Sequence, residues 1–349
     1  MPGSIELGVD SFAAAPLDGA GDPQRTSEQL RDLVEQIVQA DRVGLAAFGV
    51  GEHHRREFLD SAPTVILGAA AARTERIRLT SAVTVLSSAD PVRVFQQFAT
   101  LDLLSRGRAE IVAGRGSFVE SFPLFGFALE DYDALFAEKL ELLLAIRDNE
   151  RVHWSGAFRA PLNGQGVYPR PLQRRLPVWL GVGGTPGSFV RAGQLGLPLM
   201  LAIIGGTPAR FRRLVELYRK AYADAGHPPD GMRVGIHALG YVADTTEAAV
   251  EEFFPGYAHT FTQAGKERGW PPVTRASFDE LRGPHGALLV GNPREVAAKV
   301  RHYDEALGGI TRLNFQMSVA GLSQAQLMHS IELLGTRVAP LLETPTPVA

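Results

Sequence analysis

The sequence predicts a single (β/α)₈ barrel that carries two insertions. Short apolar runs alternate with amphipathic helical patterns along the chain, and this alternation implies parallel strands joined by right-handed crossovers. Eight strand–helix units need about 250 residues, whereas the chain has 349. We therefore place the surplus in insertions near 151–176 and 261–289, within a barrel domain that spans 1–343 and is followed by a flexible tail at 344–349.

Eight apolar runs bounded by turn residues account for the strands of this barrel. They are Ile5–Phe12, Ala46–Gly51, Ile77–Val85, Ala109–Ala113, Val178–Val182, Leu199–Ile203, Val234–Val242 and Leu313–Met317. The expected helices are Ser27–Arg42, Ala62–Thr74, Pro91–Leu104, Asp131–Asp148, Gly187–Gln194, Pro208–Ala225, Thr246–Thr260, Pro293–Leu307 and Gln324–Leu342. In the first helix only Asp41 interrupts the apolar stripe, and Thr26 or Ser27 is expected to cap its start.

The alternative architecture is an open, doubly wound sheet. Such a sheet is expected to carry a glycine fingerprint after its first strand, but the first strand here is followed by Ala13, Ala14, Ala15 and Pro16. The glycines that start at Gly181 come closer to the fingerprint, yet a proline stands where the third glycine belongs. The barrel is therefore the preferred prediction.

Composition excludes several classes of function. The 35 basic residues are balanced by 38 acidic ones, which leaves a net charge of −3 and no basic excess to attract nucleic acid or a membrane surface. The absence of cysteine excludes disulfides, zinc–thiolate sites, iron–sulfur clusters and a cysteine nucleophile. The N-terminus lacks the pattern of a signal peptide, so we expect a soluble, cytoplasmic protein.

The active site of a barrel lies at the carboxyl ends of its strands, and the second strand ends in Glu52-His53-His54. The two histidines of an extended segment point to opposite sides, so they cannot easily hold one metal ion. A metal site and a purely structural role stay open as alternatives. We favour a proton-handling or hydrogen-bonding role for His53 in the barrel mouth, with no metal.

The ends of the fourth and fifth strands suggest an anion site. Arg115 lies between two glycines and can present its guanidinium and free backbone N–H groups to an anion. The segment Gly181–Ser188 is a glycine-rich turn into a helix, which is the physical form of a phosphate cradle. Together they favour a single phosphomonoester over a dinucleotide, although each segment taken alone also fits an ordinary turn.

A cluster of phenylalanines follows Arg115. Its members do not have helical spacing, and two interpretations stay open: they line an apolar substrate pocket, or they plug the rim of the barrel. The candidate pocket residues are Phe118, Phe122 and Phe125.

These motifs together resemble the bacterial luciferase-like flavin-dependent monooxygenases. The similarity includes the Glu-His-His triplet at 52–54, the segments 81–86 and 89–93, the segment 101–108 and the Gly-Arg-Gly at 114–116, and it continues more loosely at 196–198 and 291–317. Two positions depart from luciferase. Gly114 stands where luciferase has a reactive cysteine, and Ile203 lies near the position of a flavin-site tryptophan. We therefore expect a monooxygenase that does not emit light.

The resemblance implies a TIM barrel that binds reduced FMN or, in one branch of the family, the deazaflavin F420. By position, Ala82–Val83 matches the family's non-prolyl cis peptide beneath the flavin ring, and His53 matches the histidine beside the flavin reaction centre. The resemblance also assigns phosphate binding to a set of four residues. These are Arg115, Gly183, Gly184 and Ser188.

The implied reaction is oxygenation of a small apolar organic substrate by O₂ through a C4a-peroxyflavin. Reduced FMN would come from a separate flavin reductase, and a homodimer is the family-level expectation. Three alternatives stay open: an F420-dependent hydride-transfer oxidoreductase on the same barrel, a non-catalytic flavin-binding protein, and a metal hydrolase.

Overall fold

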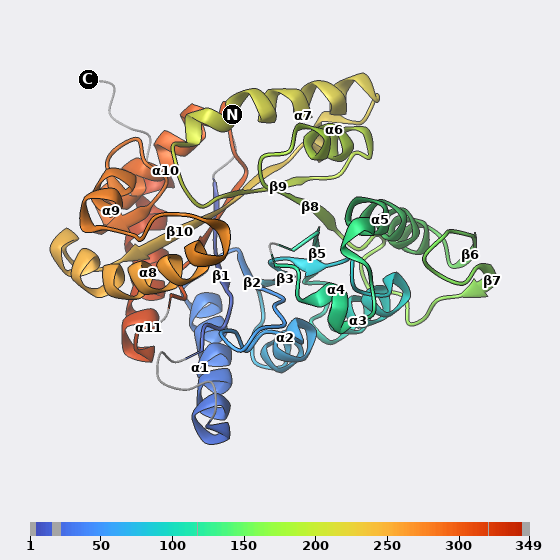
Figure 1. Cartoon of the computed structure of the whole chain (residues 1–349), viewed down its shortest axis with the longest axis horizontal. Helices are drawn as coiled ribbons and strands as arrows, with labels where there is room; N and C mark the ends of the chain where they lie inside the picture. The colour runs from blue at the N-terminus through green and yellow to red at the C-terminus, as the bar shows by residue number, and fades with distance from the viewer. Residues whose placement is uncertain (1–4, 16–21, 117, 320, 344–349) are drawn as a thin grey trace.

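The computed structural model describes residues 5–15, 22–116, 118–319 and 321–343, and its centre is a closed barrel of eight parallel strands (Figure 1). All eight predicted strands are confirmed. The barrel strands in spatial order are β1 (Glu6–Ser11), β2 (Ala47–Val50), β3 (Arg78–Ser81), β5 (Ala109–Gly114), β8 (Val178–Val182), β9 (Leu199–Ile203), β10 (Val234–Val242) and β12 (Arg312–Gln316). Parallel pairing of β12 with β1 closes the circle. The predicted tail at 344–349 lies outside the described residues.

Helices surround the strands, as the alternating pattern predicts (Figure 1). They are α1 (Pro23–Arg42), α2 (Pro63–Ala71), α3 (Pro91–Leu104), α5 (Tyr132–Asp148), α6 (Pro186–Gln194), α7 (Arg212–Asp224), α8 (Thr246–Arg268), α10 (Pro293–Leu307), α11 (Gln324–Leu333) and α12 (Ala339–Glu343). Within the described residues, no helix combines the length and apolar character that crossing a membrane requires.

The first helix starts earlier than predicted, and its cap is a different residue. The Asp22 side chain accepts a hydrogen bond from the Gln24 backbone N–H, while Thr26 Oγ1 donates to the Asp22 carbonyl from within the helix.

The interruption of the apolar stripe of α1 at Asp41 also has a structural reason. Its buried carboxylate accepts backbone N–H bonds from three successive residues, 75 to 77, at 2.7 to 3.1 Å. Asp41 therefore fixes the turn that leads into β3.

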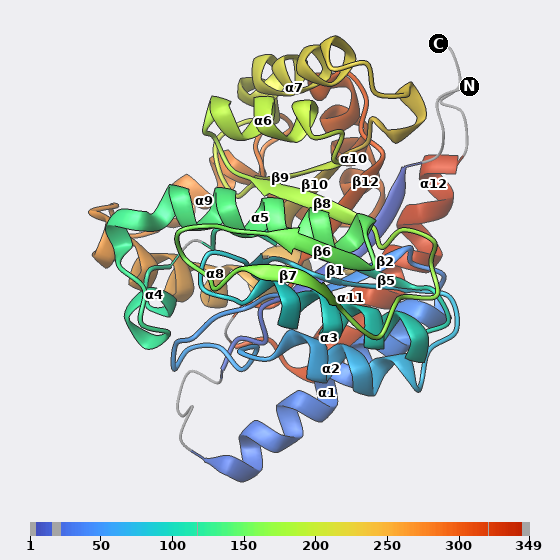
Figure 2. The same ribbon diagram turned by 90° about the vertical axis from the view of Figure 1, so that its right-hand side faces the viewer.

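The first insertion is an ordered hairpin. Strands β6 (Arg151–Trp154) and β7 (Leu162–Gly166) pair antiparallel, and the hairpin lies beside α5 on the outside of the barrel (Figures 1 and 2). The short helix α4 (Ser121–Leu124) precedes α5.

The second insertion, expected near 261–289, consists largely of regular structure. Helix α8 runs eight residues beyond its predicted end, and α9 (Arg275–Arg282) and β11 (Leu289–Gly291) follow it. Helix α8 ends where Gly269 adopts a left-handed conformation with φ of 68°, which glycine accommodates without a side-chain clash. Strand β11 pairs in parallel with the carboxyl end of β10. A small aromatic core that includes Phe253, Tyr257 and Phe278 holds this insertion together.

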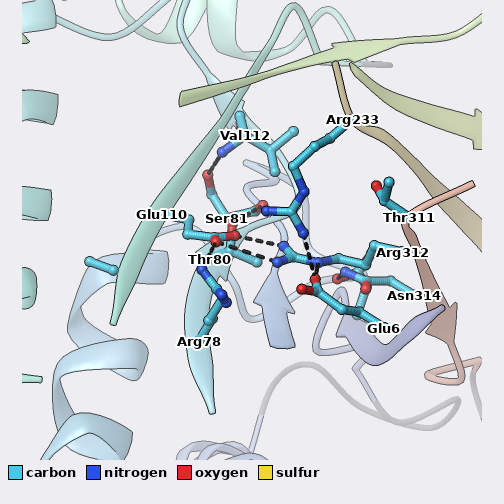
Figure 3. Close-up of polar contacts among 12 residues, drawn as sticks. Glu6, Arg78, Thr80, Ser81, Glu110, Val112, Arg233, Thr311, Arg312 and Asn314 are labelled. Atoms are coloured by element: carbon cyan, nitrogen blue, oxygen red, sulfur yellow. Dashed lines mark hydrogen bonds and ion pairs between the residues drawn. The ribbon is translucent and has the colours of Figure 1, made fainter. Parts of the chain in front are cut away.

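The amino-terminal end of the barrel interior is closed by buried ion pairs (Figure 3). Arg312 is fully buried and donates to Glu110 at 2.6 Å and to Glu6 at 2.8 Å. Arg78 and Arg233 each add a second cation to one of these carboxylates. We call this group of ion pairs the barrel floor. Because every charge in it has an opposite partner, the free-energy cost of removing these charges from water is offset. The space for a ligand lies at the other end of the barrel.

Candidate active site

A cavity of about 1460 Å³ lies at the carboxyl ends of the barrel strands. Side chains of the strands and of the loops after β2, β5 and β8 line it, and α8 contributes one wall. Ligand cavities commonly have volumes of about 300 to 1,000 Å³, so this one has room for two organic molecules together.

One wall of the cavity is made of small residues and bare backbone. The peptide bond between Ala82 and Val83 is cis, as the resemblance predicts. A Cβ atom added to Gly114 or Gly181 would lie 2.6 or 2.9 Å from the Val83 side chain, so both positions require glycine. This packing explains why the position of the luciferase cysteine is a glycine here, and it leaves a wall against which a planar ring system can lie.

His53 lies in the cavity and is held by a buried carboxylate. Its Nδ1 is 2.9 Å from Asp60 Oδ2, and its backbone N–H donates to Asp60 Oδ1 at 3.1 Å. Burial raises the pKa of Asp60 above its ordinary value, although the hydrogen bond from His53 lowers it. Gly51 makes the contact possible, because a Cβ there would lie 2.6 Å from Asp60 Oδ2. The pair orients the ring and leaves Nε2 without a hydrogen-bond partner among the described residues.

The neighbouring members of the Glu-His-His triplet have other contacts. Glu52 accepts the Val85 backbone N–H at 2.9 Å and holds the segment after the cis peptide. His54 pairs with Glu52 at 3.2 Å and meets the edge of the Phe125 ring. His53 and His54 therefore diverge, as the extended segment predicts.

A second histidine–carboxylate pair, absent from the sequence interpretation, also lines the cavity. His237 Nδ1 is 2.7 Å from Asp10 Oδ2, and Asn314 donates to Asp10 Oδ1 at 2.9 Å. Gly49 leaves the space for the carboxylate, since a Cβ there would lie 2.1 Å from Asp10 Oδ1. The available signal was periodicity: polar side chains occupy every second position of β12, and such alternation identifies residues that face the barrel interior.

The predicted phosphate residues come together at the start of α6. Arg115 Nη2 donates to Ser188 Oγ at 3.2 Å, and its Nη1 lies 2.5 Å from Asp133. The N-cap residue of α6, Thr185, makes no side-chain capping bond within the described residues. Pro186 carries no N–H and the Ser188 N–H donates to the Thr185 carbonyl at 3.0 Å, so the Gly187 N–H is the first-turn donor that can face an anion. Cβ atoms added to Gly183 and Gly184 would meet nothing within 4 Å. Open space, an uncapped helix start and a guanidinium fit a phosphate group.

The three candidate pocket phenylalanines separate in the structure. Phe118 lines the cavity. Phe122 is fully buried against Tyr132, with ring centroids 5.4 Å apart, and Phe125 lies half exposed beside His54. For Phe122 and Phe125 the structure thus corrects the pocket prediction, because α4 turns one ring into the core and the other toward the surface.

Aromatic rings from three segments form the apolar wall of the cavity. Phe12 lies 4.7 Å from the His53 ring and 5.4 Å from the His237 ring, measured between centroids. Phe58 stacks on His53 at 4.3 Å, and Phe118 meets the same ring edge-on at 5.6 Å. The two histidines therefore share one aromatic wall.

Arg55 joins the mouth of the cavity to α8. Its guanidinium lies 2.5 Å from Glu120 and 2.5 Å from Glu267, and 3.3 Å from Glu57. It also lies 4.7 Å from the centroid of the Phe118 ring. Only 16% of the Arg55 side chain is exposed, so this contact holds three segments together over the aromatic wall and limits the access of water.

The chain belongs to the luciferase-like monooxygenase family, whose model matches residues 10–309. It is 25% identical over 319 residues to limonene 1,2-monooxygenase of Rhodococcus erythropolis, which covers 88% of this chain and 80% of that protein. It is 27% identical to 4-hydroxyprotoasukamycin monooxygenase of Streptomyces nodosus subsp. asukaensis, over 89% of this chain and 86% of that one. The protein is therefore an oxidoreductase of this family.

Solved structures share the fold over almost the whole chain. Monooxygenase RslO1 from Streptomyces bottropensis superposes with a TM-score of 0.84 at 22% identity, over 96% of this chain and 99% of that one. The FMN complex of the oxygenating constituent of 3,6-diketocamphane monooxygenase from Pseudomonas putida gives 0.77 at 21%, over 97% and 99%. An F420-dependent secondary alcohol dehydrogenase gives 0.74 at 18%, over 97% and 99%. The family fold thus accepts both cofactors.

Proposed function

We propose that the protein is a monooxygenase that uses reduced FMN and O₂ to oxygenate an apolar organic substrate. The observation that supports this most strongly is the combination, in one cavity, of a phosphate site and a flat wall beside a carboxylate-held histidine. Arg115, Ser188 and the first turn of α6 would hold the FMN phosphate. The wall formed by Ala82, Val83 and the facing glycines would support the ring system.

Bound reduced FMN would supply the electrons that activate O₂. The task of the chain's own residues is then to keep the reacting atoms dry and to manage protons. His53 is the candidate catalytic residue, because Asp60 fixes its Nδ1 and its Nε2 is free to hold or deliver a proton in the cavity. The aromatic wall and the Arg55 contacts exclude water from that side.

We propose that a separate reductase delivers the reduced FMN. This is supported by the similarity to the 3,6-diketocamphane monooxygenase structure, whose chain is described as the oxygenating constituent of that enzyme. We also propose a homodimer, because the adjacent helices α2 and α3 expose Val65 and Leu104. Light scattering of the purified protein tests the dimer, and a monomer would contradict it.

The cofactor is tested by anaerobic titration with reduced FMN and, separately, with reduced F420. Saturable FMN binding followed by substrate-dependent O₂ uptake would support the proposal. The F420 alternative has its own support in the similarity to F420-dependent enzymes. Binding of F420 alone, with hydride transfer and no O₂ uptake, would replace the monooxygenase with that activity. Binding of either flavin without any turnover would leave a non-catalytic flavin-binding protein.

A further inference from the structure

The Asp10–His237 pair lies in the cavity but has no part in the function proposed so far. Only 10% of the His237 side chain and 2% of the Asp10 side chain are exposed. A buried carboxylate needs compensating partners, and Asp10 has two, the imidazole at 2.7 Å and the Asn314 amide at 2.9 Å. Strands β10 and β12 thus supply the two partners of the Asp10 carboxylate on β1, and the hydrogen bond to Asp10 fixes the orientation of the His237 ring.

This arrangement determines which ring nitrogen faces a ligand. With Nδ1–H directed at Asp10, the neutral imidazole presents Nε2 as a hydrogen-bond acceptor. The structure shows no hydrogen bond from His237 Nε2 to any described residue. His237 therefore presents an oriented hydrogen-bond acceptor to a ligand, and the Asp10 carboxylate is the ionisable group in direct contact with its ring.

The surroundings of His237 indicate what kind of ligand fits. The Phe12 ring stacks on it at 5.4 Å with an interplanar angle of 13°. Leu239, Tyr257 and Val319, which belong to one buried apolar cluster, line the same cavity. A planar aromatic molecule can continue this stack, and only a ligand with an O–H or N–H group can satisfy Nε2.

We propose that His237 is a further catalytic residue, whose Nε2 accepts the proton of a hydroxyl group on a planar aromatic substrate. In this step the substrate O–H bond breaks, its electron pair stays on oxygen, and an N–H bond forms on the imidazole, which becomes an imidazolium paired with Asp10. Only a proton is transferred, so the substrate is neither oxidised nor reduced in this step. The resulting phenolate is a more electron-rich target for oxygenation. The proposal rests on the proposed function, because the phenolate is formed in order to be oxygenated. Binding and deprotonation of the phenol do not themselves require flavin.

The test uses 4-nitrophenol, because its phenolate absorbs at a longer wavelength than its phenol. The purified protein is titrated with the probe, without flavin, at a pH about one unit below the free pKa of the probe. We expect bound probe to show at least a tenfold higher ratio of phenolate to phenol than free probe, since an adjacent positive charge lowers the pKa of a phenol by about one unit or more. The His237→Gln variant should bind the probe in its neutral form.

The matched control is His329→Gln, which breaks another histidine–carboxylate pair, with Asp244 at 2.9 Å, on the exposed surface. It should leave the spectrum of the bound probe unchanged. Neutral probe in the wild type, absence of probe binding, or equal ionisation in His237→Gln would each overturn the proposal. The wild-type spectrum decides the question even if that variant does not fold.

Flavin titrations separate this proposal from the proposed function. His237→Gln should keep its affinity for reduced FMN, and Arg115→Ala should keep the ionisation of the bound probe. Loss of FMN binding in His237→Gln would make His237 a flavin ligand and overturn the assignment. If the wild type ionises the probe but binds no FMN, the proposed function fails while the proton acceptor stands.

Discussion

Arg115 and Ser188 meet at 3.2 Å, although they lie 73 residues apart on the loop after β5 and the first turn of α6. The contact places a guanidinium at an uncapped helix start, beside glycines with open space above them. Asp133 neutralises the same guanidinium from the solvent side, where 77% of its side chain is exposed. A phosphate group can therefore replace this carboxylate or share the guanidinium with it.

Replacing Arg115 with Ala should weaken binding of reduced FMN. Loss of one charge-assisted contact costs about 2 kcal/mol, or roughly a 30-fold rise in the dissociation constant. Anaerobic equilibrium titration measures the effect, and Arg159→Ala, an arginine of the hairpin loop paired with Asp90, serves as the control. Unchanged FMN affinity in Arg115→Ala would remove this residue from the phosphate site.

Replacing His53 with Ala should lower turnover while FMN affinity changes little. General acid–base catalysis contributes about 10²-fold or more, and the ring contacts no predicted phosphate residue. Single-turnover kinetics with reduced FMN and saturating substrate measure the loss. Asp60→Asn should give a smaller defect of the same kind, because it keeps the shape of the pair and removes its charge. Full activity of His53→Ala would exclude His53 from the mechanism.

Removing Arg55 should open the mouth of the cavity. The Arg55→Ala variant loses the contacts to Glu120 and Glu267, so the end of α8 should become more accessible to protease. With FMN and substrate present, a several-fold larger share of the consumed O₂ should appear as hydrogen peroxide, because water reaches the reacting atoms. If Arg55→Ala is cleaved by protease at the wild-type rate and releases the wild-type share of hydrogen peroxide, the Arg55 contacts do not keep water out of the site.

Replacing Glu110 with Gln should destabilise the barrel strongly. The change removes the buried one of the two carboxylate partners of Arg312 and leaves only the partly exposed Glu6, and breaking such a buried pair costs about 3–5 kcal/mol of the free energy of unfolding. Denaturant unfolding measures this cost. Glu216→Gln, which breaks an exposed pair with Arg212 on α7, should change the free energy by less than about 1 kcal/mol. Equal effects of the two substitutions would contradict the role of the barrel floor.

The same carboxylate predicts a pH dependence of stability. Burial alone would raise the pKa of Glu110, but Arg312, Arg78 and Arg233 hold it below the ordinary value of 4.5. A lowered pKa means that the unfolded chain binds the proton more readily, so this contribution is complete above about pH 4.5 and falls as the pH drops. Unfolding free energies measured from pH 7 to pH 3 should decline more steeply for the wild type than for Glu110→Gln. Parallel curves would contradict the prediction.

The strands and most of the helices could be predicted because each has a strong period or a clear boundary. The barrel floor and the Asp10–His237 pair were missed for a physical reason. Apolar residues mark the face of a strand that packs on the helices, whereas these interior positions carry polar side chains whose partners come from strands far apart in sequence. Arg312 is buried only because Glu6 and Glu110 meet it in space.

The candidate site was predicted where one short segment carries the chemistry. The Gly-Arg-Gly segment and the glycine-rich turn before α6 were identified in this way, and so was His53. The partner of His53 was not, because Asp60 lies in an irregular loop whose path depends on Gly51. The prediction that all three phenylalanines after Arg115 line the pocket was wrong for a related reason. Composition identifies an aromatic cluster, but the path of the chain through α4 decides which ring faces the cavity.

The most direct test of the proposed cofactor site is an anaerobic titration of the purified protein with reduced FMN, followed by addition of O₂ with and without candidate aromatic substrates. We predict saturable FMN binding that is about 30-fold weaker in Arg115→Ala, and O₂ uptake that yields oxygenated product. Absence of FMN binding, or equal affinity in wild type and variant, would contradict the cofactor site on which the proposed function depends.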